Sequence, residues 1–271
     1  MRDDPTRSAM FRDNERAWDA RVPVHAASDF YDLAGFRAGA LSLKAPERAL
    51  VGEVRGQRLL HLMCHFGLDT LSWARLGARE VVGVDFSAEA VRLARGLAAE
   101  LALPARFVRC NVYDTRRALD ERFDVVFTSY GVLGWLPDLV PWARVVHDSL
   151  EPGGRFVLVE FHPYVWMSQV GPDLAIRYPY FDRGPISETT DGTYADRGAA
   201  LRLEEHGWNH SIADVVNALL GAGLRLERLE ELDSVPYDVF PNLVRGADGG
   251  YRFRAAEGMV PMLLGIVARR P

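Results

Sequence analysis

The chain has 271 residues, of which 48% are hydrophobic and 25% are charged, and its formal net charge is −5. These proportions are ordinary for a globular protein, and the length suits one large α/β domain or one such domain with an elaborated lid. The negative charge argues against binding to duplex nucleic acid, which needs a basic protein face. The chain contains no run of about 18 apolar residues, so the sequence predicts no membrane-spanning helix.

The N-terminal segment is charged and lacks the apolar core of a secretory signal, so we expect a cytoplasmic protein. The two cysteines, Cys64 and Cys110, follow predicted buried strands, and we expect free thiols there, although a disulfide is possible in principle. The chain has neither a CxxC pair nor an HExxH motif, and its histidines have no recognisable ligand spacing, so the sequence predicts no dedicated metal site.

The first fifty residues read as helices, and we expect residues 1–55 to form a helical cap on a main domain of residues 56–271. In the main domain, short apolar strands alternate with amphipathic helices, which predicts an α/β fold with a parallel sheet covered by helices on both faces. Strands are expected at 59–63, 80–85, 105–110, 123–129, 155–160, 224–233 and 259–269, and helices at 69–76, 88–100, 115–119, 139–150 and 211–222.

Three segments of this main domain read as irregular. Pro152-Gly153-Gly154 is expected to break the chain between a helix and the next strand, and a polar loop is expected between 233 and 259. Residues 161–205 are rich in Pro, Gly, Asp and aromatic residues and show no long periodic segment. Because this stretch leaves the carboxyl end of a central strand, we expect an inserted lid over a ligand crevice.

The most informative stretch runs from Arg58 to Ser87 and reads as strand, tight turn, helix and second strand. Asp85 ends the second strand about 20 residues after the turn, where a carboxylate can accept hydrogen bonds from both hydroxyls of a ribose. Ser87 is the predicted N-cap of the next helix, so Asp85 is not needed for capping. The sequence therefore predicts a cofactor that contains adenosine.

These elements, together with Cys110-Asn111-Val112, Phe123-Asp124-Val125-Val126 and residues 150–159, resemble the class I S-adenosylmethionine-dependent methyltransferases. The amino-acid sequence of residues 61–73 is similar to that found in a bacterial subgroup of small-molecule methyltransferases. The resemblance implies a Rossmann-like, seven-stranded sheet, mostly parallel with a closing antiparallel strand. It also implies S-adenosyl-L-methionine as cofactor and methyl transfer to O, N or C of a small-molecule acceptor. One departure is clear: the family usually has glycines where this chain has Met63 and His65.

By the same resemblance, Asp85 binds the ribose hydroxyls, Phe86 and Asn111 lie at the adenine, and the turn wraps the methionine moiety. Phe86 could instead be ordinary packing, Asn111 a turn residue and Tyr130 a core aromatic. The implied cofactor-binding residues are Met63, Cys64, His65, Gly67, Asp85, Phe86, Asn111, Val112, Ser129 and Tyr130.

Methyl transfer from a sulfonium needs alignment and a dry pocket, and a hydroxyl or acidic carbon acceptor also needs a proton acceptor. His162 and His210 are the candidate bases, each with a structural role as the alternative. Arg21 could pair with an anionic group or be a solvated helix residue. The candidate substrate residues are aromatic: Trp18, Tyr31, Tyr164 and Trp166.

Two other functions are considered. A NAD(P)-dependent oxidoreductase shares the strand–helix–strand start, but the motif GxGxxG is absent. A non-catalytic, S-adenosylmethionine-binding regulatory protein is suggested by the altered turn at Met63 and His65. For the enzyme, we expect a small-molecule partner, neither nucleic acid nor membrane, and a monomer or homodimer.

Overall fold

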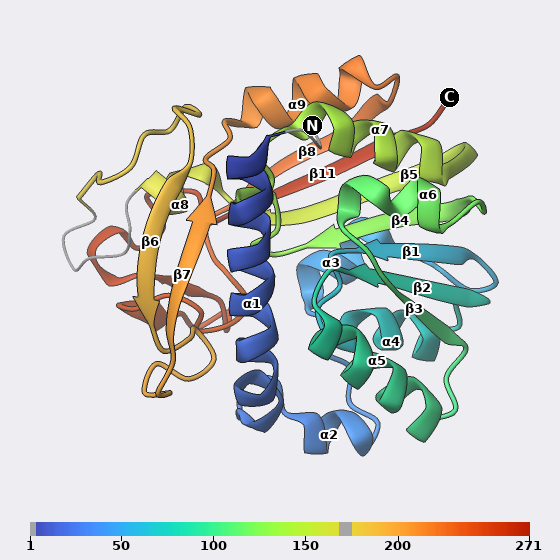
Figure 1. Cartoon of the computed structure of the whole chain (residues 1–271), viewed down its shortest axis with the longest axis horizontal. Helices are drawn as coiled ribbons and strands as arrows, with labels where there is room; N and C mark the ends of the chain where they lie inside the picture. The colour runs from blue at the N-terminus through green and yellow to red at the C-terminus, as the bar shows by residue number, and fades with distance from the viewer. Residues whose placement is uncertain (1–3, 168–174) are drawn as a thin grey trace.

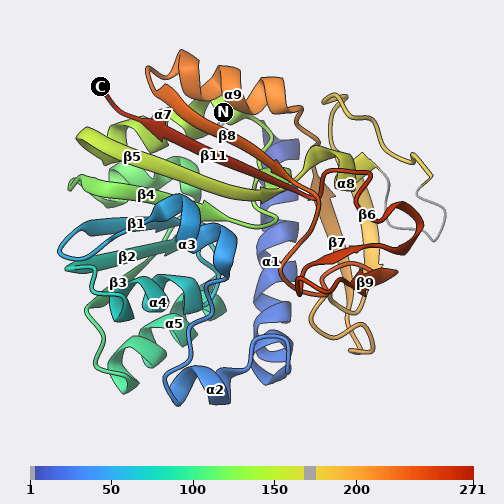
Figure 2. The ribbon, with the colours of Figure 1, turned by 180° about the vertical axis from the view of Figure 1, so that it is seen from behind.

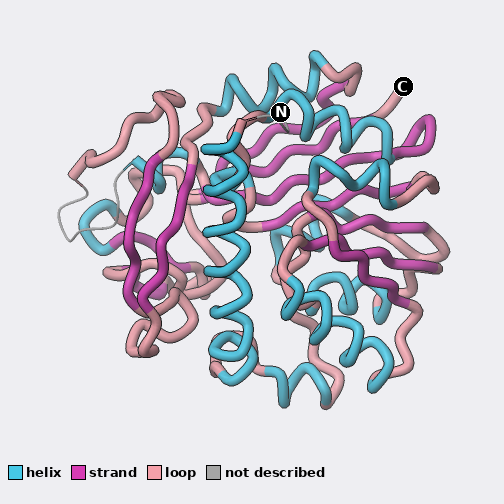
Figure 3. The backbone as a smooth tube through the Cα atoms, viewed as in Figure 1, coloured by secondary structure: helices cyan, strands magenta, loops and turns pink. Residues whose placement is uncertain are grey.

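The computed structural model describes residues 4–167 and 175–271. Its strands form one large sheet with helices on both faces and two separate two-stranded sheets. Helix α1 crosses the carboxyl ends of the parallel strands, between the large sheet and the hairpin β6–β7 (Figures 1 and 2). Figure 3 shows the same view with the helices and strands in different colours.

The helices are α1 (Pro5–Ala27), α2 (Leu33–Arg37), α3 (Ala45–Val51), α4 (Leu68–Arg75), α5 (Ala88–Glu100), α6 (Thr115–Ala118), α7 (Leu139–Ser149), α8 (Pro163–Met167) and α9 (Ile212–Gly221). The strands are β1 (Arg58–Leu62), β2 (Glu80–Asp85), β3 (Ala105–Arg109), β4 (Phe123–Ser129), β5 (Leu150–Phe161), β6 (Ile186–Asp191), β7 (Arg202–Gly207), β8 (Arg225–Leu232), β9 (Leu243–Arg245), β10 (Tyr251–Phe253) and β11 (Leu263–Arg269). The described helices are too short or too polar to cross a bilayer.

The large sheet has the order β3-β2-β1-β4-β5-β11-β8. The first five strands run parallel, and β11 is antiparallel to both of its neighbours, β5 and β8. The predicted seven-stranded, mostly parallel sheet with a closing antiparallel strand is therefore confirmed. The strand order reverses between β1 and β4, and such a switch point opens a crevice at the carboxyl ends of the strands.

Alternation along the strands produces the two helical layers. Leu60 and Leu62 of β1 face the side covered by α7 and α9, where Trp142 is fully buried. Leu59 faces the opposite side, where Trp73 of α4 packs with residues of α3. Because successive strand residues point to opposite faces, a continuous apolar run such as Val125-Val126-Phe127 in β4 indicates a strand buried on both sides.

The predicted helix start at Ala88 is confirmed, because the Ser87 side chain accepts a hydrogen bond from the backbone N–H of Ala90 at 3.1 Å. The two cysteines are free thiols, as expected. The helical character of the first fifty residues is confirmed as well. Helix α1 begins at Pro5, where Asp4 caps the exposed N–H groups of Thr6 and Arg7.

The break predicted at Pro152-Gly153-Gly154 is wrong, since β5 already starts at Leu150 and includes these residues. The pairing of β5 with β4 shifts its register between Phe123 and Val125, so the strand bulges there instead of ending. Gly153 has a φ of 79°, and its N–H donates to the carbonyl of Arg270 at 2.8 Å.

The description of residues 161–205 as lacking regular structure is also wrong, because β6 and β7 pair as an antiparallel hairpin. In β6, half-buried residues alternate with exposed ones, but the half-buried positions include Glu188 and Thr190. The period-2 pattern is thus carried by polar side chains, and hydrophobicity alone does not reveal it. The polar loop predicted after 233 likewise contains the β9–β10 hairpin.

Candidate functional site

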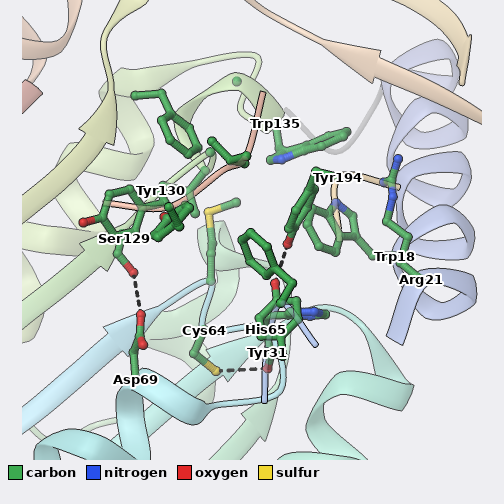
Figure 4. A pocket seen from close by; sticks show the side chains of 18 of the residues that line it. Trp18, Arg21, Tyr31, Cys64, His65, Asp69, Ser129, Tyr130, Trp135 and Tyr194 are labelled. Atoms are coloured by element: carbon green, nitrogen blue, oxygen red, sulfur yellow. Dashed lines mark hydrogen bonds between the residues drawn. The ribbon is translucent and has the colours of Figure 1, made fainter. Parts of the chain in front are cut away.

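A cavity of about 850 Å³ lies at the carboxyl ends of the parallel strands, under α1 and the β6–β7 hairpin. This volume is in the range of small-molecule and cofactor sites. We call the residues at the tips of β1, β2 and β4, with those of α3 and the first turn of α4 beside them, the wall of the cavity. The roof consists of lining residues of α1, of Phe30 and Tyr31 after it, and of residues 161–166 and 177–209. In Figure 4, Asp69 and Ser129 lie on one side of the cavity and Trp18, Arg21 and Tyr194 on the other.

The turn after β1 has alternating left-handed residues. Met63, His65 and Gly67 have φ angles of 58°, 51° and 82°. At Gly67 an added Cβ would lie 2.5 Å from Cε1 of Phe107, so this position requires glycine. Met63 and His65 adopt the left-handed conformation despite their side chains. The backbone conformation that glycine favours is therefore present at both positions although neither residue is glycine.

The His65 ring is held by residues of the N-terminal segment. Its Nε2 lies 2.9 Å from Nδ1 of His25, and its centroid lies 5.2 Å from that of Trp18 and 5.6 Å from that of Tyr31. Burial lowers the pKa of His65 well below its ordinary value, so the ring is neutral. Aromatic packing from α1 and the residues that follow it therefore surrounds the side chain that replaces a glycine.

Asp85 lies at the tip of β2 and lines the cavity. Its Oδ2 accepts from the backbone N–H of His65 at 2.8 Å, and its Oδ1 accepts from the N–H of Ser87 at 2.9 Å. Burial raises the pKa of Asp85 to about 6, while the backbone N–H groups lower it. Each oxygen retains capacity to accept a further hydrogen bond, which suits a vicinal diol.

Asn111 and Val112 line a second, smaller cavity of about 20 Å³. It shares Asp85, Phe86 and two further residues with the large cavity, which places the predicted adenine residues beside the predicted ribose residue. The Asn111 side chain accepts from the N–H of Tyr113 at 3.1 Å, so it also serves as a turn residue. A purine requires more room than this smaller cavity has. Phe11 of α1 is one of the residues that line it.

Ser129 and Tyr130, at the end of β4, line the cavity, and so do Met63, Cys64, His65, Gly67 and Phe86. Asp69, in the first turn of α4, also lines the cavity and was not predicted from the sequence. Its carboxylate accepts from the Ser129 hydroxyl at 3.4 Å and from the Ser42 hydroxyl at 2.6 Å. Burial raises its pKa. The position of Asp69, two residues after Gly67, is a sequence feature that could have identified it as a site residue. Its contact with Ser42 could not be predicted, because Ser42 is distant in the sequence.

The roof contains three of the four predicted substrate residues: Trp18, Tyr31 and Trp166 line the cavity, and Tyr164 does not. Tyr31 hydrogen-bonds through its hydroxyl to Tyr194, which was not among the predicted site residues (Figure 4). The interpretation of Arg21 as a solvated helix residue is wrong, because its buried guanidinium pairs with Glu205 of β7.

The two predicted bases do not reach the cavity. His162 Nε2 lies 2.8 Å from the Glu231 carboxylate, and its Nδ1 accepts from the N–H of Tyr164 at 3.0 Å. His210 Nε2 donates to the carbonyl of Leu136 at 2.7 Å. These contacts do not support the prediction that either ring acts as a base. The His162 ring connects β8 to the start of α8, and the His210 ring bonds to the backbone at Leu136. In residues 4–167 and 175–271, no group of three or more metal-ligating side chains could hold an ion.

A family model described as a methyltransferase domain matches residues 59–154. An uncharacterized methyltransferase of Synechocystis sp. is 31% identical over 169 residues, which cover 60% of this chain and 76% of that protein. A ubiquinone biosynthesis O-methyltransferase of Alkalilimnicola ehrlichii is 31% identical over 107 residues, 40% of this chain and 42% of that enzyme. The chain spans about half or less of the first curated relatives that it matches, between 40% and 52% of their lengths.

Among solved structures, an S-adenosylmethionine-dependent methyltransferase of Mesorhizobium loti superposes with a TM-score of 0.56 at 24% identity. The superposition covers 82% of this chain and 95% of that one, which establishes the similarity of the fold.

Proposed function

Because the chain belongs to the class I S-adenosylmethionine-dependent methyltransferases, we propose that it transfers a methyl group from S-adenosylmethionine to an O, N or C atom of a small molecule. The observation that carries this proposal is the buried Asp85 carboxylate at the tip of β2, fixed by the N–H groups of His65 and Ser87. The three left-handed residues of the adjoining turn support it, since they keep the backbone path that the family forms with glycines.

The residues that would hold the cofactor fit its chemistry. Asp85 offers two acceptor oxygens for a ribose diol, and Phe86 and Asn111 lie on the adenine side of it. The turn at residues 63–67 and Ser129 line the large cavity, where the amino-acid moiety would be placed. When bound, the cofactor supplies an electrophilic methyl group on a sulfonium.

The chain contributes alignment and exclusion of water. Trp18, Tyr31 and Trp166 line the roof with aromatic rings, so an acceptor beneath them is shielded from solvent. Holding two reactants in line contributes a large part of the rate in a displacement of this kind. The aromatic lining favours an apolar or ring-bearing acceptor, and the name of the Alkalilimnicola ehrlichii relative favours oxygen as the accepting atom. We further propose that the protein acts in the cytoplasm, as a monomer or homodimer.

Titration calorimetry with S-adenosylhomocysteine and with NADH tests the cofactor assignment. We expect S-adenosylhomocysteine to bind and NADH not to bind; the opposite result would overturn the proposal in favour of an oxidoreductase. Turnover is then measured as conversion of S-adenosylmethionine to S-adenosylhomocysteine with a panel of phenols, amines and activated carbon acids. Cofactor binding without conversion on any acceptor would instead favour the non-catalytic alternative.

A further inference from the structure

Three side chains lie along one face of helix α1 beside the cavity. Trp18, Arg21 and His25 are spaced by three and four residues, which places them on the same side of the helix. The Cζ atom of Arg21 lies over the Trp18 ring at 5.2 Å from its centroid, and the centroid of the His25 ring lies 6.1 Å from that of Trp18. Arg21 lines the cavity although it is only 6% exposed. The roof of the cavity therefore contains a buried cation.

The ion pair of this cation uses one of its three nitrogens. Nη2 of Arg21 pairs with the carboxylate of Glu205, whose Oε2 accepts from the Thr190 hydroxyl at 2.7 Å. Nε and Nη1 of Arg21 are buried and have no hydrogen-bond partner within residues 4–167 and 175–271. A guanidinium has five N–H donors, and buried donors without partners are unfavourable. These two nitrogens therefore indicate that a ligand supplies the missing acceptor.

The neighbouring imidazoles add one further donor. Nδ1 of His25 and Nε2 of His65 lie 2.9 Å apart, so one of these nitrogens donates to the other. Burial, and then the charge of Arg21, lower the pKa of His25 to about 3, so this ring is neutral like that of His65. Each neutral imidazole carries one N–H group, and one of the two is used between the rings. The other is therefore on His25 Nε2 or His65 Nδ1, which are both buried and without a partner among the described residues.

Charge and ring packing indicate which kind of ligand suits these donors. The charge of Arg21 acts on both imidazoles even though Glu205 pairs with it, so the pair leaves a positive field at these rings. Donors in a positive field suit a carboxylate, whose oxygens accept charge-assisted hydrogen bonds. Trp135 and Tyr194 line the cavity beside Trp18, and the Trp135 ring centroid lies 5.5 Å from that of Trp18 (Figure 4). A planar ring that carries a carboxylate fits both features.

The position of Arg21 separates this site from the residues assigned to the cofactor. Asp85 belongs to the wall, whereas Arg21 belongs to the roof and lies across the cavity from Asp69 and Ser129 (Figure 4). Under the proposed function, on which this inference rests, the acceptor lies beneath the roof. We propose that the methyl acceptor is an aromatic carboxylic acid and that Arg21 binds its carboxylate.

The test uses two probes of nearly the same shape that differ in charge, 4-fluorobenzoate and 4-fluorobenzamide. Fluorine NMR measures their binding to the protein saturated with S-adenosylhomocysteine. We expect the wild type to bind the benzoate at least about 10-fold more tightly than the amide. Arg21→Met removes the guanidinium but keeps an unbranched side chain, and it should reduce this preference below about 3-fold. The matched control is Arg177→Met, which removes an exposed cation that also lines the cavity and should keep the preference.

Absence of benzoate binding, or equal affinity of the wild type for the two probes, would overturn the inference without any variant. A preference that persists in Arg21→Met, or that is lost equally in Arg177→Met, would overturn it as well.

Calorimetry with S-adenosylhomocysteine separates this inference from the proposed function. Its affinity should change less than about 3-fold in Arg21→Met, which also shows that the variant is folded. A loss of about 10-fold or more would assign Arg21 to the carboxylate of the cofactor and overturn the inference. If S-adenosylhomocysteine does not bind the wild type, the proposed function fails and this inference fails with it. Probes that bind with equal strength beside bound S-adenosylhomocysteine remove only the carboxylate site.

Discussion

The wall and the roof of the cavity are built in different ways. The wall comes mainly from one run of sequence, in which Met63–Gly67 and Asp85 belong to one strand–helix–strand unit. The roof joins segments that are far apart: the Asn14 side chain exchanges two hydrogen bonds of 2.8 Å with the backbone of His206, and Arg21 pairs with Glu205. Local sequence therefore specifies the wall, where we expect the cofactor to lie, whereas the roof on the acceptor side depends on long-range contacts.

The largest expected effect concerns the geometry of the wall. Gly67→Ala places a Cβ 2.5 Å from the Phe107 ring at a left-handed position, and we expect a loss of roughly 3 kcal/mol in the free energy of unfolding. The control is Gly96→Ala in the middle of α5, where an added Cβ meets nothing within 4 Å. It should stabilise the protein by about 0.5–1 kcal/mol. Urea denaturation measures both, and equal effects would contradict the special geometry of the turn.

The next prediction is that the free energy of unfolding depends on pH through Glu47 of α3, which lines the cavity. Burial raises the pKa of Glu47 from 4.5 to about 7, so the folded protein keeps a proton that the unfolded chain releases. The stability from this proton is complete below about pH 4.5 and is lost as the pH rises through about 7. Glu47→Gln removes this dependence and should therefore stabilise the ligand-free protein at pH 8 by ~2 kcal/mol. Denaturation at pH 5 and pH 8 measures it; a variant with the slope of the wild type would contradict the assignment.

A third prediction compares the wall with the roof directly. Asp85→Ala should weaken S-adenosylhomocysteine binding at least ~10-fold, about 1.4 kcal/mol, because the ribose loses its acceptor. Tyr194→Phe in the roof removes the hydrogen bond with Tyr31 and should change that affinity less than about 2-fold, while it costs about 1 kcal/mol of stability. Calorimetry on both variants decides. A larger loss of affinity from Tyr194→Phe than from Asp85→Ala would contradict the assignment of cofactor binding to the wall.

The smallest expected effect concerns a residue outside the cavity. His162→Ala removes contacts with Glu231 and with the N–H of Tyr164, and we expect a loss of about 1 kcal/mol in stability. The affinity for S-adenosylhomocysteine and the turnover should not change once the protein is folded. A loss of turnover at full stability and unchanged affinity would restore His162 as a candidate base.

Most of the wall could be predicted because its signals are local. Continuous apolar runs identify the strands, and Asp85 is identified by its place at a strand end after a turn of fitting length. The aromatic residues around His65 could not be foreseen, since Trp18 comes from a helix some 45 residues upstream whose apolar pattern is weak. The β6–β7 hairpin was missed because its half-buried face is largely polar. The predicted bases do not line the cavity, because strand-end position does not determine where a ring points.

We place the cofactor along the wall of the cavity, with its ribose on Asp85. A crystal structure of the complex with S-adenosylhomocysteine tests it most directly. We expect both ribose hydroxyls within hydrogen-bond distance of the Asp85 carboxylate. Density for the ligand at another site, or a ribose that makes no contact with Asp85, would contradict the account.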